Sequence, residues 1–246
     1  MNARIKVMLV DDSAVVRQVF AAMLGDEPEI EWLGAFPDPI FAQKAMAHVW
    51  PDVLILDVEM PRMDGITFLQ QLMATKPLPV IICSTLTTAG AATTVAALQA
   101  GAFEIIEKPN TAVRDQLSKH KQRFLSSIKS AARANVRAIR SLDVSARSST
   151  TSERIETQPA RLNAQSLSET TERLVAIGTS TGGTQALELL LRALPLNSPG
   201  IVIVQHMPAA YTQAFADRLN SVCDIRVKQA SEGHRILAGH AYIAPG

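Results

Sequence analysis

The sequence predicts an α/β protein with two domains, each built on a parallel β-sheet. Short apolar runs alternate with helical patterns along both halves of the chain. Strands that are apolar on both faces are typical of parallel sheets covered by helices. A stretch rich in Ser, Thr, Gln and Asn separates the halves at residues 141–171, and this composition favours a flexible linker. A length of 246 residues accommodates two ordinary domains.

The first half contains five predicted strands, which are apolar runs at residues 5–10, 32–36, 53–56, 79–83 and 102–107. Helical patterns lie between them, including residues 14–24, for which Ser13 is a candidate N-cap, and residues 40–49. This alternation predicts a doubly wound parallel sheet with helices on both faces.

Polar side chains follow the carboxyl ends of four of these strands, namely Asp11, Asp12, Asp57, Ser84 and Lys108. In an open α/β sheet this edge is where ligands bind. Three carboxylates in one crevice repel one another unless a cation shares them, which favours Mg²⁺. A carboxylate there can also attack a phosphoryl group and form an aspartyl phosphate. Taken singly, each residue is as readily a helix cap or turn residue as a site residue; together they favour a site.

With the loop Met60-Pro61-Arg62-Met63-Asp64-Gly65 and with Lys108-Pro109, this set resembles the receiver domain of response regulators. The resemblance implies that Asp57 accepts a phosphoryl group and that Asp11 and Asp12 hold Mg²⁺ with it, together with a backbone carbonyl near Glu59. It also implies that Ser84 and Lys108 sense the phosphate. Receivers usually carry an aromatic switch residue three positions before the lysine, whereas this chain has Ile105.

The middle of the chain is helical in pattern over residues 111–140 and is rich in Lys and Arg. A basic helix can be a partner or nucleic-acid surface, or simply a solvated face. We favour the solvated face, because no aromatic residues are interleaved for base stacking. We expect a receiver domain over residues 1–125, a flexible linker over 126–171 and a second domain over 172–246.

The second half begins with an apolar run at residues 174–177, followed by Gly178-Thr179-Ser180-Thr181-Gly182-Gly183 and a helix start. This string fits the Gly-x-Ser-x-Gly nucleophile elbow. Glycines allow a sharp turn, and the turn residues Thr181, Gly182 and Gly183 at a helix N-terminus suit a developing oxyanion. A turn that binds phosphate or only packs is the alternative. A Walker A loop is excluded, because no Lys follows.

Three further strands are predicted at residues 200–205, 225–229 and 241–244, and a helix at 210–220. His206 follows the first of these strands, one strand–helix unit after Ser180. If the two strands are neighbours, a histidine beside a serine hydroxyl can accept its proton and activate it for acyl transfer. A packed or capping histidine is the alternative for His206.

A receiver, a polar linker, this serine turn and Gln205-His206-Met207-Pro208 together resemble the CheB family of chemotaxis protein-glutamate methylesterases; residues 239–246 match a further stretch of that family. The resemblance implies that Ser180 is the nucleophile and His206 the base. They would hydrolyse γ-glutamyl methyl esters and deamidate glutamines on methyl-accepting chemotaxis receptors, with no cofactor for the hydrolysis. It also implies that phosphorylation by the chemotaxis histidine kinase relieves blockage of the catalytic face.

The family completes its catalytic triad with an Asp in a later glycine-rich loop, and neither Asp217 nor Asp224 lies in a matching motif. We therefore expect the sequence to be a fragment whose catalytic domain is truncated at its C-terminus. The catalytic rate falls by orders of magnitude when the histidine lacks its orienting aspartate. A catalytically incomplete, phospho-responsive binding module that docks receptor or kinase is thus the alternative function.

Composition sets the remaining expectations. The formal net charge is +1, so charge does not point to nucleic acid or a membrane surface. No apolar run is long enough to span a bilayer, and no export signal is evident. Cys83 and Cys223 show no metal or redox spacing and fit a reducing compartment. We expect a cytoplasmic protein that neither inserts into membranes nor binds nucleic acid.

Overall fold

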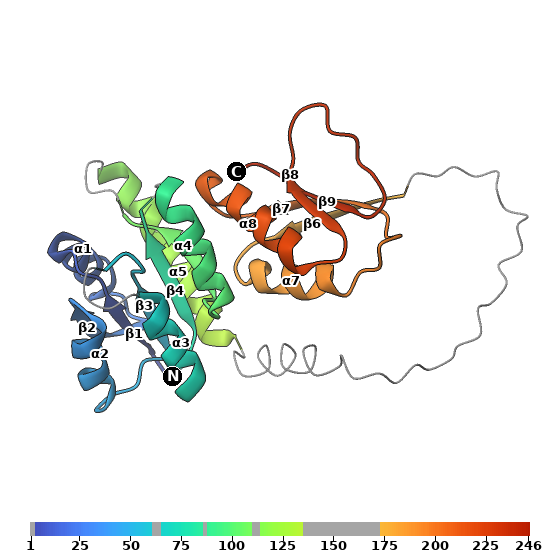
Figure 1. Ribbon diagram of the computed structural model, residues 1–246. Coiled ribbons are helices and arrows are strands. Elements are labelled where there is room, and N and C mark those ends of the chain that lie inside the picture. Colours follow the sequence, from blue (N-terminus) through green and yellow to red (C-terminus); the bar gives the residue numbers. More distant parts are fainter. Residues whose placement is uncertain (1–2, 61–64, 86–87, 110–113, 135–172) are drawn as a thin grey trace, which may run out of the picture.

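The computed structural model describes residues 3–60, 65–85, 88–109, 114–134 and 173–246 (Figure 1). Its first sheet has five parallel strands in the order β2-β1-β3-β4-β5. The strands are β1 (Ile5–Val10), β2 (Ile30–Phe36), β3 (Val53–Leu56), β4 (Val80–Ser84) and β5 (Glu104–Glu107). The strand order reverses between β1 and β3, and such a switch point creates a crevice at the carboxyl edge of the sheet. The predicted doubly wound sheet is therefore confirmed.

Helices cover both faces of this sheet, and alternate strand residues build two apolar layers. The helices are α1 (Ala14–Leu24), α2 (Pro39–Met46), α3 (Gly65–Thr75), α4 (Thr88–Gln99) and α5 (Arg114–Arg133). Val7, Leu9 and Ile55 pack with α1 and α5 on one face. Met8 and Leu54 pack on the other face, in the cluster that contains residues of α2, α3 and α4. Burial on both faces explains why these strands are apolar throughout.

Local signals explain the helix boundaries. Ser13 caps α1, because its hydroxyl accepts a hydrogen bond from the Val16 amide at 3.4 Å. Asp38 caps α2 in the same way, accepting from the amides of Ile40 and Phe41. The second strand begins at Ile30, earlier than predicted, because Ile30 pairs with Ile5 in register with β1.

The last helix of the first domain extends past residue 125. Ile128 and Ala131 are buried with Phe124 in the core that α5 shares with α1. On the same helix, Lys121 and Lys129 form ion pairs with Glu27 and Glu29 respectively. The segment 126–134 thus packs as part of the first domain, and the rest of the predicted linker, residues 135–171, lies outside the described residues.

The second sheet has four parallel strands in the order β6-β7-β9-β8. They are β6 (Leu174–Thr179), β7 (Gly200–Gln205), β8 (Arg226–Gln229) and β9 (His240–Ile243), with helices α7 (Gly183–Arg192) and α8 (Ala209–Val222). The register of β6 and β7 sets Thr179 opposite Gln205. The residues that follow these two strands, Ser180 and His206, therefore meet at one edge.

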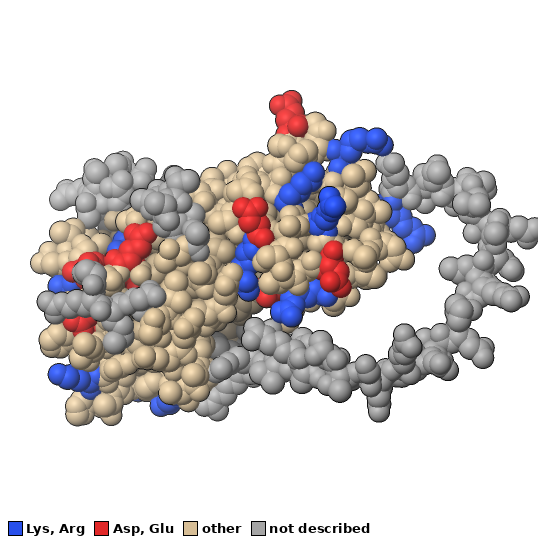
Figure 2. All heavy atoms as spheres, viewed as in Figure 1, with Lys and Arg blue, Asp and Glu red and all other residues tan. Residues whose placement is uncertain are grey.

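The two domains contact each other through α4 and α8, which lie side by side (Figure 1). On the face seen in Figure 2, acidic and basic side chains are interspersed. No helix in the described parts of the chain is both long and apolar enough to cross a bilayer.

Candidate phosphorylation site and active site

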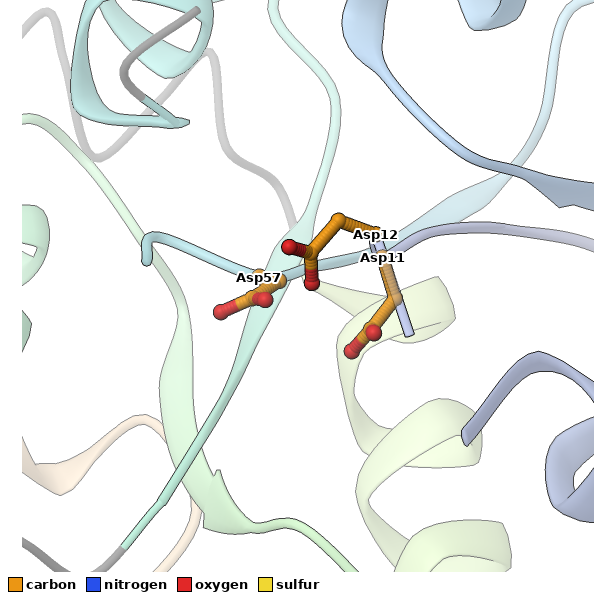
Figure 3. Close-up of side chains that lie close together, drawn as sticks. All are labelled: Asp11, Asp12 and Asp57. Atoms are coloured by element: carbon orange, nitrogen blue, oxygen red, sulfur yellow. The ribbon is translucent and has the colours of Figure 1, made fainter. Parts of the chain in front are cut away.

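The predicted acidic cluster forms at the switch point of the first sheet. Asp11 and Asp12 follow β1, and Asp57 follows the neighbouring strand β3 (Figure 3). One carboxylate oxygen of each lies within 4.8 Å of the other two. Asp11 and Asp57 are fully buried, whereas Asp12 is exposed. The loop motif around them is only partly visible, because residues 61–64 lie outside the described ranges.

Lys108 joins this cluster from the end of β5. Its Nζ lies 2.7 Å from Asp57 Oδ2 and 3.0 Å from Asp11 Oδ2. Burial by itself would lower the pKa of Lys108. The hydrogen bonds to Asp57 and Asp11 and the negative charges of these two carboxylates outweigh the effect of burial and raise the pKa of Lys108. Lys108 is therefore held as a cation against both carboxylates.

Asp11 has features of a cation ligand. Burial raises the pKa of this carboxyl group, and the Lys108 charge offsets only part of that rise. Asp11 Oδ1 accepts a hydrogen bond from the Ser13 amide, whereas the buried Oδ2 has no hydrogen-bond partner among the described residues and only the Lys108 ion pair. A buried oxygen of this kind, next to two further carboxylates, fits the all-oxygen shell that Mg²⁺ prefers.

Ser84, at the end of β4, is buried, and its hydroxyl interacts away from the acidic cluster. Its Oγ lies 3.0 Å from Thr94 Oγ1 on α4 and donates to the carbonyl oxygen of Thr85 at 3.3 Å. The position matches the prediction from sequence, but these contacts do not join Ser84 to Asp57. Its role as a phosphate sensor remains a prediction.

The second predicted pair forms at the edge of the other sheet. Ser180 follows β6 and His206 follows β7, and Ser180 Oγ lies 3.4 Å from His206 Nδ1. Both residues are exposed. A serine–histidine contact of this length is loose, as such pairs commonly are without bound substrate. Asp217 accepts a hydrogen bond from Gln213 within α8, and Asp224 is an exposed residue beyond that helix; no described contact links either aspartate to His206.

Glycines are required in the turn after Ser180. Gly182 caps α7 with φ of 75°, a conformation that is costly for other residues. At Gly183 a Cβ would lie 2.4 Å from Gln205 Oε1 and 2.6 Å from Thr179 Cβ. The Gly183 amide donates to the Ser180 carbonyl at 2.8 Å. Because that bond already uses the Gly183 N–H, the amides of Thr181 and Gly182 are better candidates to stabilise an oxyanion.

The sequence assigns Gln205 no role beyond its place in the motif Gln205-His206-Met207-Pro208, but in the structure its side chain bridges the two strand ends. Its Nε2 donates to the carbonyl oxygens of Ser180 at 3.0 Å and His206 at 3.3 Å, and its Oε1 accepts from Thr179 Oγ1 at 2.7 Å. The side chain is almost fully buried. Gln205 therefore fixes the spacing of the turns that carry the serine and the histidine.

We expect Gln205→Leu to lower kcat of the predicted ester hydrolysis by about 10- to 100-fold with little change in KM, because it removes the three hydrogen bonds that hold the two turns together and so loosens the Ser180–His206 spacing. Steady-state kinetics measure the effect. Gln213→Leu, on the exposed side of α8, is the matched control and should keep wild-type kcat. A Gln205→Leu enzyme with unchanged kcat would contradict the bridging role.

The first domain covers one flank of the serine turn. Gln185 Nε2 donates to the Ala102 carbonyl oxygen at 2.8 Å, and Thr181 Oγ1 makes a long contact of 3.5 Å with Glu104 Oε1. The ring of Phe103 lies next to Gly182. These residues belong to β5 and the turn before it. The domain contact therefore reaches the residues next to Ser180 while Ser180 itself stays exposed.

Glu104 makes this contact sensitive to pH. Burial raises the pKa of its carboxyl group above the usual 4.5, and hydrogen bonds from Ser127 and Thr181 and the Arg123 charge offset part of the rise. A raised pKa means that the folded state binds the proton more tightly than the unfolded state. The stability contributed by Glu104 is thus present below pH 4.5 and is lost as pH rises through the folded pKa.

We expect Glu104→Gln to raise the free energy of unfolding at neutral pH, because glutamine resembles the protonated acid. The gain over wild type should vanish below about pH 4.5. Denaturant unfolding at a series of pH values measures the difference. Glu232→Gln, at an exposed position, is the matched control and should change the free energy of unfolding little. If Glu104→Gln raised the free energy of unfolding by the same amount below about pH 4.5, the titration of Glu104 would not be the cause.

A carboxylate cluster with a lysine on a doubly wound sheet, followed by a serine–histidine pair on a second parallel sheet, defines a response regulator with a hydrolase domain. Residues 7–120 match the family model of the response regulator receiver domain, and residues 175–246 match that of the CheB methylesterase. The chain belongs to the CheB methylesterase family.

Relatives along the whole chain agree with this assignment. A protein-glutamate methylesterase/protein-glutamine glutaminase 2 of Shewanella denitrificans is 53% identical over 97% of this chain and 67% of its own length. Its counterpart in Hahella chejuensis is 51% identical over 100% of this chain and 67% of its own length. The chain thus spans about two thirds of these relatives. The response regulator domain of Thermotoga maritima CheB is 33% identical, with a TM-score of 0.47, over 54% of this chain and 98% of that domain.

These names favour an enzyme over the non-catalytic binding module that the sequence left open. They identify the relatives as hydrolases of a carboxylic ester and a carboxamide. The receiver domain and the CheB family model also place the chain among chemotaxis response regulators.

Proposed function

We propose that this chain hydrolyses γ-glutamyl methyl esters on methyl-accepting chemotaxis receptors and deamidates glutamines of the same receptors, with Ser180 as nucleophile and His206 as general base. The observation that carries the proposal is the 3.4 Å contact between Ser180 Oγ and His206 Nδ1 at the carboxyl ends of adjacent strands. Both residues are exposed and can meet a side chain on another protein.

This geometry supports acyl transfer through a covalent intermediate. His206 takes the proton from Ser180 Oγ as the oxygen attacks the ester carbonyl, and the amides of Thr181 and Gly182 stabilise the oxyanion. The imidazolium then gives its proton to the leaving methoxide, which departs as methanol and leaves an acyl-enzyme. His206 next takes a proton from water as the water oxygen attacks the acyl carbon, and it gives that proton to Ser180 Oγ when the bond to Ser180 breaks and glutamate leaves. With a glutamine substrate the leaving group is ammonia.

The receiver regulates this reaction. Asp57 accepts a phosphoryl group from the chemotaxis histidine kinase, a partner that would meet this chain in the cytoplasm. Asp11, Asp12 and Asp57 would hold Mg²⁺, which neutralises charge on the transferred phosphoryl group. The 2.7 Å distance between Lys108 Nζ and Asp57 Oδ2 supports a role for Lys108 in pairing with the oxygens of the phosphorylated Asp57. Phosphorylation would then weaken the contact between the receiver and the serine turn.

Methanol release from a methyl-esterified receptor fragment tests the proposal. The protein purified from its native source should release one methanol for each glutamate formed, faster after phosphorylation. A protein that becomes phosphorylated and binds receptor but releases no methanol would instead be the non-catalytic binding module.

A further inference from the structure

Tyr211 connects the esterase domain to the phosphorylation edge of the receiver. It lies in the first turn of α8, five positions after His206 in the sequence (211 − 206 = 5), and its side chain is fully buried. Its hydroxyl donates to the carbonyl oxygen of Thr85 at 3.0 Å. Thr85 directly follows β4, so this contact lies at the carboxyl edge of the receiver sheet, whereas the contacts of Thr181 and Gln185 lie at the start of β5.

The tyrosine hydroxyl belongs to a cluster with two buried receiver hydroxyls. Ser84 Oγ lies 3.0 Å from Thr94 Oγ1 and donates to the same Thr85 carbonyl at 3.3 Å. Ser84 and Thr94 are both fully buried. Burial raises the pKa of Tyr211, and hydrogen bonds with the side chains of Ser84 and Thr94 partly offset the rise. The hydroxyls of Tyr211, Ser84 and Thr94 therefore share one small polar site between the domains.

A continuous path of contacts links this site to Asp57. The Glu59 amide donates to Asp57 Oδ1 at 2.9 Å, and Thr85 Oγ1 donates to Glu59 Oε2 at 3.0 Å. The carbonyl of the same Thr85 accepts from Tyr211. Any change in the position of Thr85 at the phosphorylation edge thus reaches Tyr211 directly.

Phosphorylation changes the demand for hydrogen-bond donors at this edge. A phosphoryl group adds three strong acceptor oxygens, and Lys108 is the cation already in contact with Asp57. A serine hydroxyl has a single proton, so Ser84 cannot donate to a phosphoryl oxygen and also to the Thr85 carbonyl. The receiver position that is usually aromatic is occupied by Ile105, which is buried and has no hydroxyl. The nearby aromatic hydroxyl is supplied by the other domain.

We propose that Tyr211 reports the phosphorylation state of Asp57 to the esterase domain through Ser84 and Thr85. This proposal rests on the proposed phosphorylation of Asp57. When Ser84 turns to the phosphoryl group, its bonds to Thr94 and Thr85 break, the Thr85 peptide shifts, and Tyr211 loses its acceptor. Helix α8 is then released from the receiver at the end nearest His206. Tyr211, a residue of the esterase domain, thus acts as the aromatic switch residue that Ile105 cannot provide.

The chain offers a direct test, because it contains only two tyrosines. Tyr242 is the internal control: it lies in β9, and its hydroxyl donates to the Arg235 carbonyl oxygen within the esterase domain. The protein is labelled with 3-fluorotyrosine, and the two ¹⁹F resonances are assigned with Tyr211→Phe and Tyr242→Phe. Beryllofluoride with Mg²⁺ serves as the phosphoryl mimic, and its own bound ¹⁹F signal reports occupancy of Asp57.

We expect beryllofluoride to shift the Tyr211 resonance and to leave that of Tyr242 in place. In Ser84→Ala the bound beryllofluoride signal should persist while the Tyr211 shift is lost. Bound beryllofluoride with an unmoved Tyr211 resonance, or the same shift in Ser84→Ala, would overturn this proposal and leave the phosphoacceptor intact. Absence of bound beryllofluoride would overturn the assignment of Asp57, and the proposal with it.

Enzyme activity gives a second readout. Tyr211→Phe keeps the buried ring and removes the hydroxyl with its bond to the Thr85 carbonyl, so the unphosphorylated enzyme should be about fivefold more active and should gain correspondingly less from phosphorylation. Tyr242→Phe should leave the ratio of phosphorylated to unphosphorylated activity unchanged. A Tyr211→Phe enzyme with a wild-type ratio would overturn the proposal.

Discussion

Replacing Ser180 with alanine should lower kcat for methanol release by about 10⁴-fold or more, because the nucleophile that forms the acyl-enzyme is gone. The Ser180–His206 contact of 3.4 Å predicts that the two side chains act as a unit. His206→Ala should therefore cost about as much as Ser180→Ala, and the double variant no more than either. Methanol release by the protein from its native source, at saturating methylated receptor, measures all three rates.

Ser221→Ala is the matched control for Ser180→Ala. Ser221 lies on the exposed side of α8, and its hydroxyl donates to the Arg218 carbonyl oxygen within the same helix. Removing this hydroxyl should therefore change kcat by less than about twofold. Two results would contradict the assignment: more than a tenth of wild-type kcat in Ser180→Ala, or rate losses of the two single variants that multiply in the double variant. The second result would mean that Ser180 and His206 act independently.

Replacing Asp57 with asparagine should abolish phosphoryl incorporation, because the carboxylate that attacks the phosphoryl group is replaced by an amide. The fold should survive, since Lys108 keeps its 3.0 Å ion pair with Asp11. Incubation with acetyl phosphate and Mg²⁺, followed by intact mass measurement, should show the added phosphoryl group in wild type and none in Asp57→Asn. The phosphorylated fraction should fall to background.

Asp52→Asn provides the control at the opposite end of the same strand. Asp52 precedes β3 and accepts a hydrogen bond from the Lys6 amide, far along the strand from the acidic cluster. Its replacement should leave phosphorylation at the wild-type level. Acid-labile phosphate on Asp57→Asn would place the phosphoacceptor elsewhere, and Asp11 or Asp12 would be the next residues to replace.

Much of the fold and of the candidate sites follows from the sequence, because the signals are local. Apolar runs predicted the strands, and parallel strands bring their carboxyl ends to one edge whatever the loops between them do. This rule and the pairing of neighbouring strands explain why Asp11 lies near Asp57 and why Ser180 lies near His206, as predicted. The cap at Ser13 is local in the same sense.

The tertiary structure decided which buried polar groups meet. Gln205 looked like the last residue of a strand, and only the pairing of β6 with β7 sets its amide between the Ser180 and His206 carbonyls. The contacts of Glu104 with Thr181 and of Tyr211 with Thr85 join residues 77 and 126 positions apart. No periodicity encodes such pairs, because they depend on the packing of one domain on the other. The sequence thus determined the two sheets and the side chains at their edges. Packing determined the hydrogen-bond partners of Ser84, Tyr211 and Gln205, because a buried donor or acceptor pairs with whichever polar group the tertiary structure brings next to it.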